Sequence, residues 1–272
     1  MAILKTEAVV LRTQDYRESS KILTLYTLEY GRLKLLAKGA RRLKSRFGGV
    51  LDLMNYLTIV FYHKETRDLQ LLSQADLVCP FPHLREDLRR LALASAVAEL
   101  IDRTEFGQMP NSRLFRLLIG CLRGIDEFSN PSVYFDYFTL HFLNLAGFRP
   151  RLRRCLRCGR KPGGHVVDFQ FHLGGYFCQH CSGNNQGGGF RVSLGAIRTL
   201  LALREANIAA ISQLSITPAI QKEIEELLLY YLKYHLEGFR DSTPLEFLQR
   251  LDNKNFTQRV KFTSICKEEA SV

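Results

Sequence analysis

The sequence predicts a multidomain α+β protein, in which an N-terminal five-stranded β-barrel precedes a helical domain that carries an inserted four-cysteine zinc module. Three observations lead to this prediction. Residues 6–78 contain five apolar runs joined by polar turns. From residue 88 onward, apolar positions recur every three or four residues, as in helices. Two C-x2-C pairs lie between these helices.

The five N-terminal runs have the length and the alternation of short β-strands. They read EAVVLRT, KILTLYT, RLKLLAK, LMNYLTIVFYH and DLQLLSQADLV. A five-stranded Greek-key barrel of OB type has strands of this number and length. Periodicity does not fix the order of the strands, so the barrel rests on their count and length.

The helices that follow begin at recognisable capping residues. The prolines of CPFPHL end the β pattern, and a first helix begins at residue 88. Later helices are predicted to begin near Asn111, Asn130, Ser193 and Thr217, and proline follows directly at two of these caps. Asn130 is expected to cap its helix through its side chain.

The chain is therefore divided into a barrel, a helical domain in two parts, a zinc module and a tail. In chain order the predicted ranges are 1–79 for the barrel, 80–148 for the first helical part, 149–190 for the zinc module, 191–250 for the second helical part and 251–272 for an irregular C-terminal tail.

The cysteine pairs predict a structural zinc site. CLRCG and CQHC are separated by nineteen residues, and two residues between cysteines let one tight turn offer both sulfurs to one ion. Four thiolates close the tetrahedron and leave no position for a reactive water. Two alternatives stay open: free thiols, and a three-cysteine site completed by His165, His172 or His180. The predicted ligands are Cys155, Cys158, Cys178 and Cys181.

The charge of the chain indicates a polyanionic partner. Its 38 Lys and Arg residues exceed its 27 Asp and Glu residues, which gives a net charge of +11. Nucleic acid is favoured over an acidic membrane surface. The N-terminus does not resemble a signal peptide, and no run approaches the ~20 apolar residues of a membrane span. We therefore expect a cytoplasmic protein without membrane contact.

Two stretches concentrate this charge. The first follows the third strand, contains no acid, and ends in Phe47 and two glycines; we expect Phe47 to stack on bases, and Tyr26 and Phe61 to be buried. Its cations are Arg32, Lys34, Lys38, Arg41, Arg42, Lys44 and Arg46. The second, RPRLRRCLRCGRK, surrounds the first cysteine pair and is a candidate second phosphate-facing surface, with Arg151, Arg153, Arg154 and Arg157.

No set of residues in the sequence indicates catalysis. GGGF, near residue 190, lacks the lysine and the hydroxyl residue of a phosphate-binding loop, and the histidines are scattered. We therefore expect a protein that is not an enzyme.

Two segments resemble the bacterial RecO family of recombination mediators. AVVLRTQDYRESSKILTLYTLEYGRLKLLAKGARRLKSRFGGVLDLMNYL is similar to the family's N-terminal OB domain, and LNLAGFRPRLRRCLRCGR with GGYFCQHC is similar to its zinc module. The resemblance implies binding of single- and double-stranded DNA and annealing of complementary strands. It also implies that the protein helps load recombinase RecA, together with RecR and RecF, on gaps coated by single-stranded DNA-binding protein. A cytoplasmic, nucleoid-associated location follows.

The resemblance also implies binding to the acidic tail of single-stranded DNA-binding protein. Arg113, Arg116 and Arg123 beside apolar helix positions are candidates for that site. Two other functions remain open, a zinc-stabilised RNA-binding or ribosome-associated protein and a metal-dependent hydrolase.

Overall fold

The five alternating runs form a closed barrel in the computed structural model, which describes residues 2–182, 189–239 and 242–252. The strand order around the barrel is β1-β2-β3-β5-β4, and only the β3–β5 pair is parallel. The predicted five-stranded OB-type barrel is thereby confirmed. The strands are β1 (Ala2–Tyr16), β2 (Ser20–Thr27), β3 (Gly31–Ala37), β4 (Tyr56–His63) and β5 (Leu69–Cys79).

Strand β1 closes the barrel because it is long enough to pair on both sides. Its first half pairs with β4 and its second half with β2, with a bulge between Val10 and Arg12. Alternate side chains then point inward, so that Leu25, Leu35 and Phe61 are fully buried in a core of the barrel's own.

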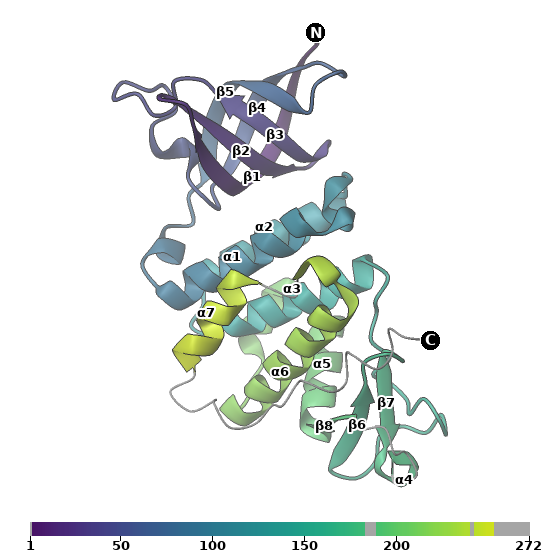
Figure 1. The fold of residues 1–272 in the computed structure, drawn as a ribbon. Helices are drawn as coiled ribbons and strands as arrows, with labels where there is room; N and C mark the ends of the chain where they lie inside the picture. The colour runs from purple at the N-terminus through teal and green to yellow at the C-terminus, as the bar shows by residue number, and fades with distance from the viewer. Residues whose placement is uncertain (1, 183–188, 240–241, 253–272) are drawn as a thin grey trace.

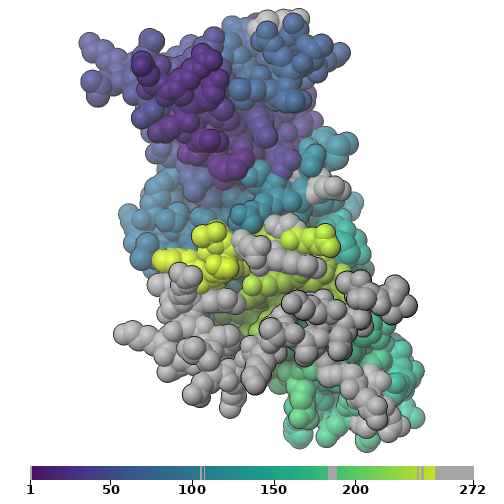
Figure 2. Space-filling view, viewed as in Figure 1, coloured from purple at the N-terminus to yellow at the C-terminus, as the bar shows by residue number. Residues whose placement is uncertain are grey.

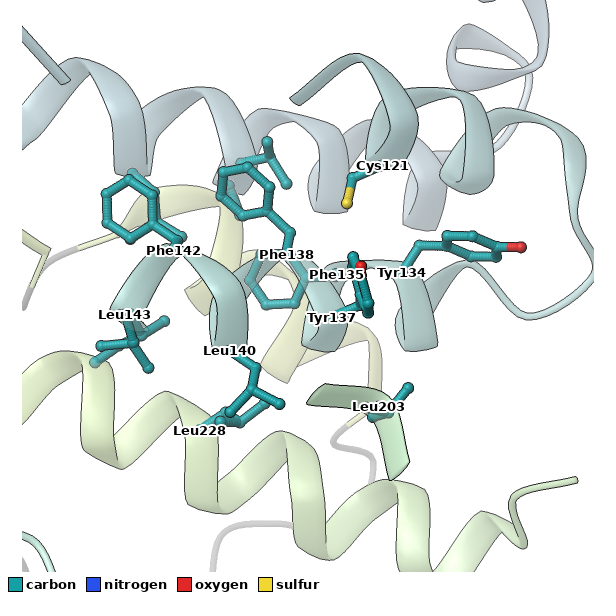
Figure 3. Close-up of a cluster of buried hydrophobic side chains, with 14 of the residues drawn as sticks. Cys121, Tyr134, Phe135, Tyr137, Phe138, Leu140, Phe142, Leu143, Leu203 and Leu228 are labelled. Atoms are coloured by element: carbon teal, nitrogen blue, oxygen red, sulfur yellow. The ribbon is translucent and has the colours of Figure 1, made fainter. Parts of the chain in front are cut away.

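The helical domain surrounds α3, which is buried on nearly every side. Figure 3 shows Phe138 and Phe142 of α3 directed toward the neighbouring helices, with Cys121 of α2 and Leu228 of α6 close by. The helices are α1 (Leu88–Arg103), α2 (Ser112–Glu127), α3 (Pro131–Leu145), α5 (Leu194–Glu205), α6 (Pro218–His235) and α7 (Thr243–Asp252).

Three of the predicted helix caps are observed and one is wrong. The side chains of Asn111, Ser193 and Thr217 accept hydrogen bonds from backbone amides in the first turns of α2, α5 and α6. Asn130 makes no side-chain cap, although α3 begins directly after it with Pro131 at its first position. Proline supplies no amide there, so that one of the donors a cap would satisfy is missing.

Helix α7 corrects the predicted tail. The helix continues to Asp252, two residues into the range predicted to be irregular, and the rest of that range, 253–272, lies outside the described residues.

One face of the barrel is docked on the helices. Tyr26 of β2 is fully buried and belongs to the helical core, and its hydroxyl donates a hydrogen bond to the carbonyl of Met109 at 3.2 Å. Gly31 of β3 has φ +66°, and a Cβ there would lie 2.3 Å from the carbonyl oxygen of Gln108. Only glycine allows β3 to approach this backbone so closely, and the junction is therefore tightly packed.

The third part of the molecule is a small antiparallel sheet with order β7-β6-β8, formed by β6 (Val166–Gln170), β7 (Gly175–Cys178) and β8 (Phe190–Ser193). A short helix, α4 (Gln179–Ser182), follows β7. Figures 1 and 2 show the barrel at one end of the molecule, the helices in the middle and this sheet at the other end. Among the described residues, no helix is both long and apolar enough to cross a membrane.

Candidate nucleic-acid interface and metal centre

The four predicted cysteines come together at the end of the molecule farthest from the barrel. The Sγ atoms of all four lie within 4.8 Å of one another, and those of Cys158 and Cys178 are 3.8 Å apart. A tetrahedral zinc ion with Zn–S bonds of about 2.3 Å requires sulfurs about 3.8 Å apart. The sulfurs therefore already have the spacing that a tetrahedral metal ion demands.

Backbone geometry explains how the first pair reaches this position. The amide of Gly159 donates to the carbonyl of Cys155 at 3.0 Å, and Gly159 adopts φ +69°, which favours glycine. The tight turn that results presents Cys155 and Cys158 on one side. The second pair comes from the end of β7 and from α4.

The environment of Cys155 favours its thiolate form. Burial raises the pKa of the Cys155 thiol, but hydrogen bonds from the amides of Cys158, Cys178 and Arg157 outweigh it and bring the pKa to about 6. The amide of Cys178 lies 3.3 Å from the Cys155 sulfur. These donors would equally stabilise a metal-bound thiolate.

The histidine alternative finds no support in the geometry. His165, His172 and His180 are exposed, and none joins the group of sulfurs. Within the described ranges, no other group of three or more His, Cys, Asp or Glu side chains could share an ion. The hydrolase alternative therefore gains no second metal site from these residues.

The basic stretch after β3 forms an ordered projection from the barrel, which we call the basic loop (residues 38–47). The amide of Ser45 donates to the carbonyl of Arg42 at 2.9 Å and closes a tight turn. The amide of Arg41 donates to the carbonyl of Ser19, and its guanidinium lies 3.3 Å from the carboxylate of Asp15. The loop is thus attached to the β1–β2 hairpin. Its exposed cations are Lys38, Arg41, Arg42, Lys44 and Arg46.

The expectation for Phe47 is wrong. Its side chain is only 2% exposed and fills the barrel core beside Leu51, where no base could stack on it. Burial of a phenyl ring in a small core is worth more than its exposure in a loop, because the ring removes a large apolar area from water. The guanidinium of Arg46 lies over the Phe47 ring at 4.9 Å. Tyr26 and Phe61 are buried, as predicted.

The structure separates the two strand cations from the basic loop. Arg32 donates to the backbone carbonyl of Asp102 on α1 and so lies in the junction with the helices, which corrects its prediction as a DNA contact. Lys34 is exposed on the outside of the barrel. There it borders a hollow of about 310 Å³ with Arg12, Thr24 and Leu69.

The second basic stretch surrounds the cysteines, and part of it holds them in place. Arg154 donates to the carbonyl of Gly159 at 3.0 Å, and Arg157 donates to that of Cys181 at 2.9 Å. Arg153 pairs with Glu205 at 2.6 Å. Arg151 and these three side chains are all exposed, so a phosphate-facing role for them stays a prediction.

The arginines of α2 also remain a prediction. Arg113, Arg116 and Arg123 are exposed, whereas Leu114 and Leu118 on the same helix are buried in the helical core.

The sequence gave no reason to select two residues that the structure distinguishes. Leu43 at the tip of the basic loop is fully exposed. Arg204 on α5 donates to the carbonyl of Pro150 at 3.3 Å. Burial, and then Arg149 and Arg153, lower the pKa of Arg204. Hydropathy would have flagged Leu43 as an apolar residue among cations, but the position of Arg204 depends on contacts far apart in the chain.

The fold and the two sites define a class of protein: an OB-type barrel with a basic loop, docked on a helical domain that carries a four-thiol metal-binding module. OB barrels of this kind serve nucleic-acid binding in many proteins.

Comparison with known proteins identifies the family. Residues 1–81 match the family model for the recombination protein O N-terminal domain, and residues 85–244 match that for its C-terminal domain. The chain belongs to the recombination protein O (RecO) family.

Individual relatives support this assignment along nearly the whole chain. A protein named DNA repair protein RecO from Roseiflexus sp. (strain RS-1) is 32% identical over 90% of this chain and 85% of its own length. Proteins of the same name from Desulforamulus reducens and Desulfatibacillum aliphaticivorans are 31% and 34% identical over 94% of this chain, and over 97% and 100% of their own lengths.

Proposed function

We propose that this protein is a DNA-binding recombination mediator in DNA repair, and that it is not an enzyme. The observation that carries the proposal is the basic loop, an anchored projection whose cations Arg42, Lys44 and Arg46 are exposed. Cations presented in this way neutralise the phosphates of a nucleic-acid backbone and release its counterions. The shared name of the relatives, DNA repair protein RecO, supports DNA as the ligand.

Annealing follows from holding backbones while leaving bases free. The basic loop and the arginines around the cysteines lie at opposite ends of the molecule (Figure 1), so that two strands can be bound without competing for one surface. Each surface lowers the repulsion between phosphates and leaves the base edges accessible for pairing.

The partners of the family complete this proposal. The protein acts with RecR and RecF to help RecA load on gaps coated by single-stranded DNA-binding protein, and it binds the acidic tail of that protein. Arg113, Arg116 and Arg123 on α2 supply three exposed cations for the tail. A cytoplasmic location at the nucleoid is part of the same proposal.

The metal centre holds zinc in this proposal, with Cys155, Cys158, Cys178 and Cys181 as its ligands. Zinc bound by four thiolates supplies folding free energy and no catalytic water. The ion would fix the knuckle and, through it, the exposed arginines on either side of Cys155.

Salt dependence tests the proposal. The triple variant Arg42→Ala, Lys44→Ala, Arg46→Ala should reduce the slope of log affinity against log salt by up to ~3 for single-stranded DNA, since each lost phosphate contact removes slightly less than one unit. The matched control Arg113→Ala, Arg116→Ala, Arg123→Ala removes the same charge from α2 and should leave the slope near that of the unaltered protein.

Three outcomes would count against the proposal. Equal slopes in both triple variants would mean that net charge, and not the basic loop, carries binding. Preference for RNA over single-stranded DNA of equal length would favour the RNA-binding alternative. Strand cleavage would contradict a protein that is not an enzyme.

A further inference from the structure

The tip of the basic loop is a leucine that no part of the protein covers. Leu43 has a relative exposure of 107%, the highest value among the large apolar side chains described as exposed. It occupies one of the two central positions of the turn that the Ser45 amide closes onto the Arg42 carbonyl. The turn therefore points the Leu43 side chain into solvent.

This tip is held in place from both sides. Before it, Arg41 is bound through its amide to Ser19 and through its guanidinium to Asp15. After it, Phe47 is buried in the barrel core, and the Phe47 amide donates to the hydroxyl of Ser45 at 3.2 Å. Because both ends are attached to the barrel, the loop presents Leu43 at a defined position.

The chemistry around Leu43 selects its occupant. Arg42, Lys44 and Arg46 are exposed on either side, and no acid interrupts the stretch. Cations of this kind bind phosphates, whereas leucine gains only by leaving water. On a DNA strand the apolar surface next to the phosphates lies between stacked bases, and leucine is among the side chains that proteins insert there.

We propose that Leu43 inserts between neighbouring bases of a DNA strand whose phosphates are bound by Arg42, Lys44 and Arg46. This inference rests on the proposed DNA binding and adds a distinct action to it, the unstacking of a base step. Unstacking costs least where bases are already unpaired, so that the tip acts on single strands and at the ends of duplexes. An unstacked step displays its pairing edges, which favours the search of a complementary strand.

The test uses the full-length protein and a single strand of about 12 nucleotides, close to the length that an OB barrel covers. Several adenines are replaced by 2-aminopurine, which becomes brighter when unstacked, and a second dye on the same strand reports binding by anisotropy. Three variants are compared with the unaltered protein. Leu43→Ser removes the wedge, Leu43→Met retains an apolar tip, and Leu88→Ser removes another exposed leucine, on α1.

The expected result is a rise in 2-aminopurine fluorescence, on the order of twofold, with the unaltered protein, Leu43→Met and Leu88→Ser. Leu43→Ser should bind with an affinity within about twofold of the unaltered protein, because its cations remain, and should give no rise.

Each contrary result has its own meaning. Binding without a rise in fluorescence for the unaltered protein, or an equal rise with Leu43→Ser, would overturn the wedge and leave DNA binding intact. Absence of any anisotropy change would overturn the proposed function as well. Loss of binding to anionic lipid vesicles in Leu43→Ser, with no change on DNA, would assign the tip to a membrane surface and overturn the inference.

Discussion

Arg32 on β3 donates to the backbone carbonyl of Asp102 on α1, and the carboxylate of Asp102 lies 3.4 Å from the same guanidinium nitrogen. The other carboxylate oxygen of Asp102 lies 3.6 Å from Nε of Arg12 on β1. One acid of the helical domain thus takes a cation from each of two barrel strands. The outward-facing charge of β3 serves the docking of the barrel at this point.

Replacement of Arg32 by alanine should lower the free energy of unfolding by about 1–3 kcal/mol, because the Asp102 carbonyl and carboxylate lose a charged donor in a half-buried junction. Urea unfolding measures the change. Arg12→Ala is the matched control: Arg12 is 58% exposed, and the expected loss is below about 1 kcal/mol. The salt slope of DNA binding should not change in Arg32→Ala; a reduced slope with unchanged stability would make Arg32 a DNA contact after all.

Phe47 should act on stability and not on base stacking. Phe47→Ala leaves a cavity in the barrel core, and the expected loss is about 3–5 kcal/mol in the free energy of unfolding. Phe47→Leu keeps most of the apolar volume and should cost less than half as much. The folded Phe47→Leu protein should bind single-stranded DNA with nearly the affinity of the unaltered protein. A sharp loss of affinity at unchanged stability is what a stacking role would produce, and it would contradict this assignment.

The local features of this chain were predictable, because each depends on residues close in sequence. Alternation identified β2 and β3, the prolines marked the end of the barrel, and two residues between cysteines placed Cys155 beside Cys158. The capping side chains of Ser193 and Thr217 were predictable for the same reason, since a cap reaches only its own first turn.

The errors come from contacts between distant segments. Alternation correctly placed Arg32 on the outside of β3, but the helices cover that part of the barrel, and its partner Asp102 is 70 residues away. Phe47 follows the basic loop without any periodicity, so that its burial depends on the space left at the end of the closed barrel. Leu43 and Phe47 exchange the roles that their chemistry alone suggests.

The metal centre should bind one zinc ion per chain and lose it when one ligand is replaced. Cys178→Ser removes a buried sulfur at the end of β7, and elemental analysis should find a large loss of zinc. A chelator should lower the melting temperature of the unaltered protein, because metal binding stabilises the folded state. Cys79→Ser is the control, since Cys79 lies outside the cluster and its replacement should leave the zinc content unchanged. Full zinc content in Cys178→Ser would exclude this sulfur as a ligand.

The helical core contains an acid whose ionisation should make stability depend on pH. Asp136 on α3 is 1% exposed, and one of its carboxylate oxygens accepts a hydrogen bond from Nε2 of Gln221 at 2.5 Å. The other carboxylate oxygen has no hydrogen-bond partner among the described residues. Burial, and then the negative charge of Glu225, raise the pKa of Asp136 well above its ordinary value, against the opposing effects of Gln221 and Arg89.

The sign of the effect follows from this direction. An acid whose pKa is higher in the folded state contributes stability that is fully present below its unfolded pKa of about 3.9 and is lost as the pH rises toward its folded pKa. Asp136→Asn cannot ionise and so avoids this loss. The free energy of unfolding of the variant should therefore rise relative to that of the unaltered protein, by up to about 1.4 kcal/mol per pH unit above pH ~4, until the folded pKa is reached.

Urea unfolding of the two proteins at several pH values measures this difference. Glu127→Gln, which removes an exposed acid from α2, is the matched control, and its stability should follow that of the unaltered protein at every pH. Parallel curves for Asp136→Asn and the unaltered protein would mean that Asp136 ionises as easily in the folded chain as in the unfolded one. The carboxylate would then have to be compensated in the core, and Arg89, 3.5 Å from Glu225, is the nearest cation that the structure offers for that role.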